Sequence, residues 1–276
     1  MREVGAARPS VLDLKRDPDP RPEHGALLVA LDRYPDLDRG ACLRLIEEIA
    51  QPLRARAVTW EGSADAQARG VVDHLCDRHG FHGAVEDYYD PRNSYLNDVL
   101  ERRVGIPITL SILAIAVARR AGVVADPVGF PGHFLVQIGG RPGVYVDAFF
   151  ARVLTRQRDL DILAERFLGA ANRLRPEHLA PVGTLSIVVR VLLNLKHAYE
   201  RIADHPNALV VCDRLVDLAG VPEHRRDRGL HALALGAREA AVEDLEAYLA
   251  ARPNAPDEAS IRSTLGSGTR TPISSN

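Results

Sequence analysis

The stretch GIPITLSILAIAVARRAG, residues 105–122, decides the fold of the chain around it. Apolar residues fill almost every position after its proline, so the segment predicts a helix that is buried on most sides. Pro107 stands in the first turn, where proline is well tolerated because that N–H has no partner inside a helix. A buried helix start also offers free N–H groups and positive potential to an anion. Thr109 and Ser111 are candidates for a pocket at this end, although helical hydroxyls often bond back to a carbonyl instead.

A β-hairpin is predicted shortly after this helix. In HFLVQI, residues 133–138, apolar residues recur with period two, GGRPG supplies a turn, and VYVDAFF, residues 144–150, returns as the second strand. His133 and Asp147 then lie opposite or diagonal to each other, close enough for an imidazole–carboxylate hydrogen bond. Such a bond orients the ring, as in a nucleophilic triad. The same pair can instead serve only to satisfy two half-buried polar groups.

Most of the remaining chain has a helical period. Upstream, apolar residues recur at helical spacing within residues 26–56 and again within 64–78. After residue 180, four helical segments form two pairs with a weak internal repeat. The second pair resembles a tetratricopeptide repeat, since several of its residues fall at the helix-turn-helix positions of that pattern: Leu235, Gly236, Ala241, Tyr248 and Pro253. Two repeats bury little core alone, so we expect them to dock on the preceding domain or on another chain.

The composition excludes several classes of protein. The 35 basic and 37 acidic side chains give a net charge of −2 without a basic block, which argues against a nucleic-acid partner. The first residues, MREVGAARPS, lack the apolar region of a secretory signal, and the longest apolar stretch is too short to span a membrane. Cys42, Cys76 and Cys212 are widely separated, so we expect no disulfide framework and a cytoplasmic protein.

One cluster of potential metal ligands stands out, formed by His74, Cys76, His79 and His82. Its spacing matches no tight zinc pattern, and a partly exposed amphipathic helix accounts for it better. We therefore expect neither a metal ion nor another cofactor.

Three segments in this order and spacing resemble the transglutaminase-like core of bacterial SirB-type proteins: YYDPRNSYLNDVLERRVGIPITLSILAIAVARRAG (88–122), VGFPGHFLVQI (128–138) and VYVDAFF (144–150). In that family, tetratricopeptide-like helices follow the core. The resemblance extends from about Ala26 to Pro253. It implies an α+β chain, with a papain/transglutaminase-like core of N-terminal helices and a small antiparallel sheet, followed by an all-α repeat region. The expected divisions are a flexible arm (1–24), a transglutaminase-like domain (25–180), tetratricopeptide-like repeats (181–258) and a disordered tail (259–276).

The wider superfamily uses Cys, His and Asp in that chain order, and its nucleophile begins a buried helix. Setting that helix on residues 105–122, with the glycines at both ends in register, puts the cysteine position on Pro107. The histidine and aspartate positions fall on His133 and Asp147. Proline has no nucleophilic side chain, and the three cysteines of the chain lie in other predicted helices. The resemblance therefore implies a transglutaminase-like protein without cysteine-type acyl transfer.

Two functions are compatible with these residues. The first is a non-catalytic binding or regulatory module, in which Pro107, His133 and Asp147 form a pocket for a small ligand and the repeats bind a protein or peptide. The loop residues expected at this pocket are Asn93, Asn97, Glu101 and Arg103. The alternative is an enzyme of altered mechanism, in which His133 acts as a general base on an acyl, amide or peptide substrate and N–H groups at the helix start stabilise negative charge.

Overall fold

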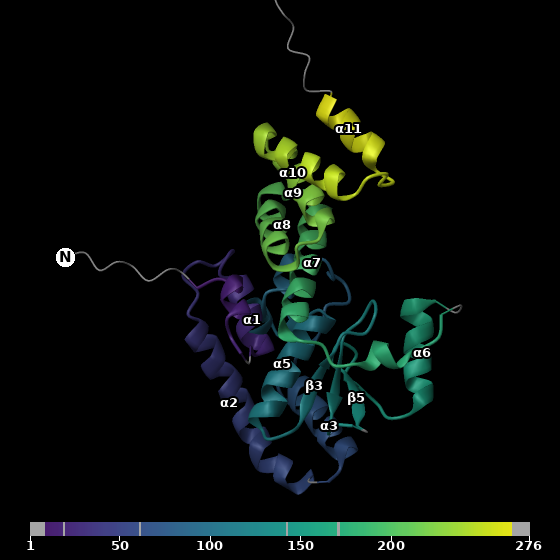
Figure 1. Cartoon of the computed structure of the whole chain (residues 1–276). Helices are drawn as coiled ribbons and strands as arrows, with labels where there is room; N and C mark the ends of the chain where they lie inside the picture. Colours follow the sequence, from purple (N-terminus) through teal and green to yellow (C-terminus); the bar gives the residue numbers. More distant parts are fainter. Residues whose placement is uncertain (1–8, 19, 61, 142, 170–171, 267–276) are drawn as a thin grey trace, which may run out of the picture. The chain divides into compact units, whose positions relative to one another are not determined.

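The computed structural model describes residues 9–18, 20–60, 62–141, 143–169 and 172–266. Its contacts divide the chain into two units, Met1–Asn194 and Leu195–Asn276. The helix α7 (Thr184–Arg201) belongs to both units, because the boundary falls inside it (Figure 1). The division therefore lies after Asn194, about three helical turns into α7, whereas the sequence predicted a domain boundary after residue 180.

The helix α5 (Pro107–Arg120) forms the centre of the first unit. Every residue from Pro107 to Ala118 is buried, as the apolar sequence predicts. α5 packs against α1 and α2 and also against the sheet described below. The other helices of this unit are α1 (Pro22–Ala30), α2 (Arg39–Ala57), α3 (Ala64–Val72), which continues as a π-helix over Asp73–Arg78, α4 (Leu96–Arg102) and α6 (Gln157–Leu168).

A four-stranded antiparallel sheet with the order β3-β4-β5-β6 completes the core of this unit. Its strands are β3 (Ala125–Val128), β4 (Leu135–Ile138), β5 (Val144–Asp147) and β6 (Arg152–Leu154). Val136 pairs with Val146 and Ile138 with Val144, which confirms the predicted hairpin as the two central strands. A separate short parallel pairing joins β1 (His82–Gly83) to β2 (Val104–Gly105).

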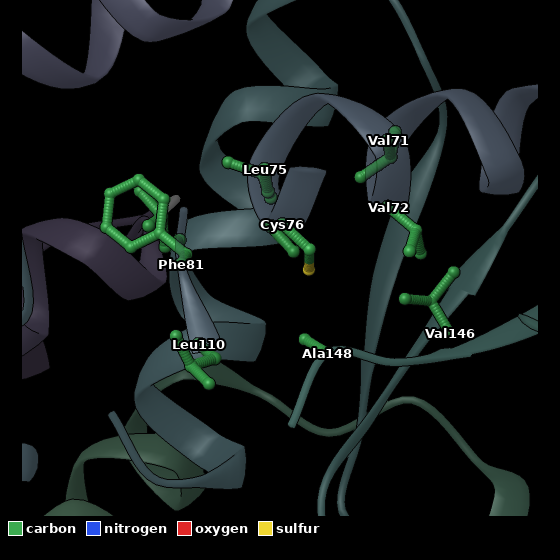
Figure 2. Close-up of a pocket in the computed structure, with 10 residues that line it drawn as sticks. Val71, Val72, Leu75, Cys76, Phe81, Leu110, Val146 and Ala148 are labelled. Atoms are coloured by element: carbon green, nitrogen blue, oxygen red, sulfur yellow. The ribbon is translucent and has the colours of Figure 1, made fainter. Parts of the chain in front are cut away.

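The two faces of the sheet are covered by different helices. Val146 shares a small apolar cavity with Leu110 of α5 and Val71 of α3, so this face packs on those helices (Figure 2). The opposite face carries Leu135, which joins a buried cluster with Leu160 and other apolar residues of α6. In Figure 1, α6 lies on the far side of β5 from α5. Because neighbours along a strand face opposite sides, Asp147 lies on the α6 side.

The second unit consists of helices, with the C-terminal part of α7 followed by α8 (His205–Ala219), α9 (Pro222–Ala234), α10 (Arg238–Ala251) and α11 (Glu258–Gly266). α9 approaches α10 closely at Gly229, where an added Cβ would lie 2.9 Å from Cγ of Leu245. Ala241 on α10 is fully buried. These small residues confirm the tetratricopeptide-like pattern of the sequence. A buried ion pair between Lys196 and Asp227 lies in the same unit.

The ends of the chain differ from the sequence predictions. Within the predicted arm, Val11 and Leu14 are buried in a 3-10 turn (Val11–Lys15), because their apolar side chains pack on the first unit. Within the predicted disordered tail, α11 forms since Ile261 packs into an apolar cluster with α10. The remaining parts of both predictions, 1–8 and 267–276, lie outside the described residues. No helix among the described residues is long and apolar enough to span a membrane.

Candidate functional site

His133 and Asp147 lie at the centre of the candidate site. Extending the register of β4 and β5 by one step puts Leu135 beside Asp147 and His133 at the diagonal position. Nε2 of His133 lies 2.9 Å from Oδ2 of Asp147, and each side chain is only 2% exposed. Among the described residues Nε2 has no hydrogen-bond partner of suitable geometry, Asp147 included. The two side chains therefore lie close together, in a contact that does not have the geometry of a hydrogen bond.

The backbone of the turn after β5 holds the carboxylate of Asp147 in place. Its Oδ1 accepts hydrogen bonds from the N–H groups of Phe149 at 3.1 Å and Phe150 at 3.2 Å. One carboxylate oxygen is thus used by the turn, while the other faces the imidazole. This arrangement leaves little freedom for the side chain to rotate.

Phenylalanine rings enclose the imidazole of His133. It stacks on Phe167 of α6 with ring centroids 4.7 Å apart, and on Phe150 at 6.0 Å. Phe149 meets its edge at 6.4 Å. These contacts explain why a histidine next to a cavity is almost completely shielded from water.

Arg190 of α7 fixes the loop that carries His133. Nη2 of Arg190 donates to the carbonyl oxygen of Phe130 at 2.8 Å and to the carbonyl oxygen of His133. Burial lowers the pKa of this guanidinium, which also lies 5.4 Å from the centre of the Phe134 ring. Sequence reasoning missed Arg190. The sequence feature that could have indicated its role is that it is a single arginine within the apolar run SIVVRVLL.

A cavity of about 340 Å³ opens beside His133. Its wall consists of Val85, Tyr88, Tyr89, Pro107, Gly132, His133, Phe149, Phe150 and Phe167. Pro107 and His133 thus share one cavity, so the helix start and the imidazole face the same space. Four of the five aromatic wall residues, Tyr88, Tyr89, Phe149 and Phe150, were part of the quoted motifs but were not predicted as site residues, and Phe167 lies outside those motifs. The signal of these four residues was the pairing of aromatic residues in YY and FF.

The four loop residues predicted for the pocket do not line this cavity. Asn93 is buried and donates from Nδ2 to the carbonyl oxygen of Asp87 at 2.6 Å, so it closes the loop before α4. Asn97 donates to the carboxylate of Asp98 at 3.3 Å. Glu101 and Arg103 are exposed near the end of α4. Asn93 and Asn97 therefore bond within the loop and helix that carry them, and Glu101 and Arg103 have surface positions.

Thr109 and Ser111 are also absent from the cavity wall. Oγ1 of Thr109 donates to the carbonyl oxygen of Asn93 at 2.8 Å and accepts from the N–H of Ile106 at 3.1 Å. It joins the start of α5 to the preceding loop. The hydroxyl of Ser111 is buried without a partner among the described residues. The structure therefore does not bring these two hydroxyls to the cavity wall, because α5 is buried from Pro107 to Ala118 and only Pro107 of this helix lines the cavity.

The cysteines lie outside the His133 cavity. Cys76 points its sulfur into the separate apolar cavity between α3, α5 and the sheet (Figure 2), where burial raises the pKa of the thiol to about 11. Burial also raises the pKa of Cys42, and that of Cys212 to about 12. These thiols are protonated at neutral pH and are poor nucleophiles. Among the described residues, no group of three or more His, Cys, Asp or Glu side chains is arranged to hold a metal ion.

The chain matches two family models. Residues 41–193 match the model described as "Transglutaminase-like superfamily", and residues 195–266 match a tetratricopeptide repeat. A "UPF0162 protein" of Xylella fastidiosa is 38% identical over 248 residues, which cover 87% of each chain. A "UPF0162 protein" of Vibrio cholerae is 32% identical over 76% of this chain and 79% of its own length. These matches confirm the resemblance to SirB-type proteins and the order of the two regions.

A shorter similarity links the chain to a eukaryotic protein. A stretch of 76 residues is 46% identical to "F-box only protein 21" of Mus musculus, but it covers 27% of this chain and 12% of that protein. The comparison with solved structures yields no significant match.

Proposed function

Because the chain belongs to the transglutaminase-like superfamily and has a proline at the helix start beside His133, we propose that it is a non-catalytic binding protein. Its cavity takes a ligand, and its tetratricopeptide repeats take a protein or peptide partner. In the first of these roles, the chain has a cavity where the superfamily has its active site, but it does not catalyse cysteine-type acyl transfer.

One observation carries this proposal, namely that Pro107 and His133 line the same cavity. No cysteine, serine or threonine is among the described residues of its wall. Among the described wall residues, Tyr88 and Tyr89 are the ones that carry hydroxyl groups. Burial raises the pKa of Tyr88, so its phenol is protonated at neutral pH. The cavity therefore has the shape of a binding site but lacks an activated nucleophile.

The repeats support the second part of the proposal. Stacked helical repeats present extended surfaces that bind other proteins. A second cavity, of about 410 Å³, lies among α8, α9 and α10. Its wall includes Arg228, which is held by Asp213 at 2.6 Å and by Asp244 at 2.6 Å. A rigid charged wall of this kind suits recognition of a polar peptide.

A fragment screen tests occupancy of the His133 cavity. We expect some fragments to shift the ring resonances of His133 in ¹H–¹³C spectra, because any occupant of the cavity changes the environment of that ring. Phe149→Ala, which alters the wall, should weaken these fragments, whereas Val124→Ala, at an exposed position outside the cavity, should not. A screen in which fragments bind but none perturbs His133 would contradict a binding role for this cavity.

The catalytic alternative has one observation in its favour. Asp147 lies beside Nε2 of His133, which leaves Nδ1 as the ring nitrogen available to act as a base. Incubation with ester, amide and peptide substrates decides between the two functions. Turnover by the unmodified chain that is lost in a folded His133→Ala variant would replace the binding proposal with an enzyme of altered mechanism.

A further inference from the structure

The cavity beside His133 has the dimensions and wall of a site for an aromatic ring. Tyr88 meets Tyr89 edge-on at 5.1 Å and Phe149 at 6.0 Å, and Phe149 meets Phe150 edge-on at 4.8 Å. An added ring would find both ring faces and ring edges in such a wall, the arrangements that aromatic pairs prefer. A volume of about 340 Å³ is at the small end of ligand pockets, enough for one ring with a short substituent.

Two arginine side chains add positive charge next to this wall. The guanidinium of Arg166 lies 4.8 Å from the centre of the Phe150 ring and 5.4 Å from that of Phe167. The guanidinium of Arg152 lies 5.7 Å from the Phe150 ring. Both arginines are exposed, and neither has an ion-pair partner among the described residues. Two like charges on one ring repel each other, so an anion bound near them would be favoured.

The start of α5, where Pro107 lines the cavity, also favours a negative group. Pro107 is the first residue of α5, a helix of 14 residues, and Ile106 before it supplies no side-chain cap. The positive end of the helix dipole therefore lies at the cavity wall. His133 lines the same wall, but its Nε2 lies 2.9 Å from Oδ2 of Asp147, so this nitrogen is turned to that carboxylate and the positive potential comes from the helix start. The acidic side chains near the wall are Asp147, which contacts His133 but does not line the cavity, and Glu86 and Asp87, on the loop that carries Val85 and Tyr88.

We propose that this cavity binds one aromatic ring that carries an adjacent carboxylate. The ring enters between the phenylalanine and tyrosine side chains, and the carboxylate faces the side of the cavity formed by Phe150, Phe167 and their two arginines. This inference rests on the proposed binding function and deepens it by naming the class of ligand. A free aromatic acid and a peptide with a C-terminal aromatic residue share this chemistry.

Three matched probes separate the ring from the charge. N-acetyl-L-phenylalanine has both, its amide has only the ring, and N-acetyl-L-leucine has only the charge. Calorimetry measures each affinity, and the His133 ring resonances report where each probe binds. We expect N-acetyl-L-phenylalanine to bind at least about fivefold more tightly than either control, the size of effect typical of one exposed ion pair or one ring contact. A tripeptide with C-terminal phenylalanine, compared with the free acid, shows which source of the ligand the cavity prefers.

Arginine variants test the charged side directly. Arg152→Gln combined with Arg166→Gln should lower the affinity for N-acetyl-L-phenylalanine by about fivefold and leave that for its amide unchanged. Arg158→Gln is the matched control, because it removes another exposed arginine from α6 that contacts none of the cavity rings in the structure. Circular dichroism spectra establish that all variants are folded.

The outcomes distinguish this inference from the proposed function. If the amide shifts the His133 resonances and binds as tightly as the acid, the inference is overturned and the binding function stands. The same holds if the double arginine variant binds the acid normally. If none of the probes reaches the cavity, the inference is again overturned, and the fragment screen alone then decides whether the cavity binds anything.

Discussion

Replacing Pro107 by cysteine would place a thiol at the first position of α5, on the wall of the cavity that His133 lines. The backbone tolerates this change, because the first N–H of a helix has no helical partner and losing a favourably placed proline costs about 0.4–1 kcal/mol. A helix N-terminus lowers a thiol pKa, and an imidazole that takes up the thiol proton does the same, from about 8.5 to about 3.5–7.5. We therefore expect the pKa of the new thiol to be about 6.

The rate of alkylation by iodoacetamide as a function of pH measures this pKa. At about pH 6, a thiol with a pKa of about 8.5 is roughly 0.3% ionised, whereas one with a pKa of about 6 is half ionised, a gain of about 150-fold in thiolate. The more acidic thiolate is also less nucleophilic, by roughly 10- to 18-fold for a Brønsted coefficient of about 0.4–0.5. The net expectation is alkylation about tenfold faster than that of an ordinary exposed thiol at this pH.

Two controls isolate the effect. The unmodified chain gives the background of its three native cysteines, which is low because burial raises their pKa values. The double variant Pro107→Cys, His133→Ala should lose much of the acceleration. If the new thiol reacts with an ordinary pH profile that does not depend on His133, Pro107 does not occupy the position assigned to it here.

Three further predictions concern stability. Asp147→Ala removes the acceptor of two partly buried N–H groups and should lower the free energy of unfolding by about 2–4 kcal/mol in urea, and a loss below about 1 kcal/mol would contradict this role. For Asp227, burial raises the pKa, but Lys196 and a neighbouring arginine lower it more, so the net pKa is below the ordinary 3.8. The stability from this carboxylate is therefore complete above that pH and is lost as the pH falls through the folded pKa. Asp227→Asn should flatten the acid branch of thermal stability, and an unchanged branch would refute this. Gly70→Ala would put a Cβ 2.2 Å from the ring of Trp60, the only tryptophan of the sequence. We therefore expect a shifted fluorescence maximum and a decrease of about 1–3 kcal/mol in the free energy of unfolding, partly offset by the helix preference of alanine. Unchanged fluorescence would count against the contact.

Local periodicity made much of the core predictable. The continuous apolar run after Pro107 predicts a buried helix, and the alternation around Val136 predicts a strand. Once those strands pair through a short turn, the contact between His133 and Asp147 follows from the register alone. These features depend on residues close in sequence, or on residues joined by a single turn.

Contacts between distant segments could not be predicted in this way. Phe167 stacks on His133 from a helix more than thirty positions later, and Arg190 reaches the same loop from a still later helix. The sequence left open whether the hydroxyl of Thr109 bonds to a carbonyl group or lines a pocket, and it did not indicate that an acceptor would lie in the preceding loop. In each case the contacting residue is determined by the packing of distant segments, and the hydrophobic period of a segment gives no information about that packing.

The position of α7 limits how the chain can be divided. Two residues in the middle of α7 make contacts in different units. Arg190 donates to the carbonyl oxygen of His133 in the first unit, and Lys196, six residues later, is the buried partner of Asp227 in the second. Fewer than two helical turns separate them, and a cut helix frays over its last turn. A chain shortened anywhere between the two residues therefore puts one of them in a frayed end. Exchanging the repeats through a cut between these two residues would therefore disturb either the loop that carries His133 or the buried ion pair of the repeats.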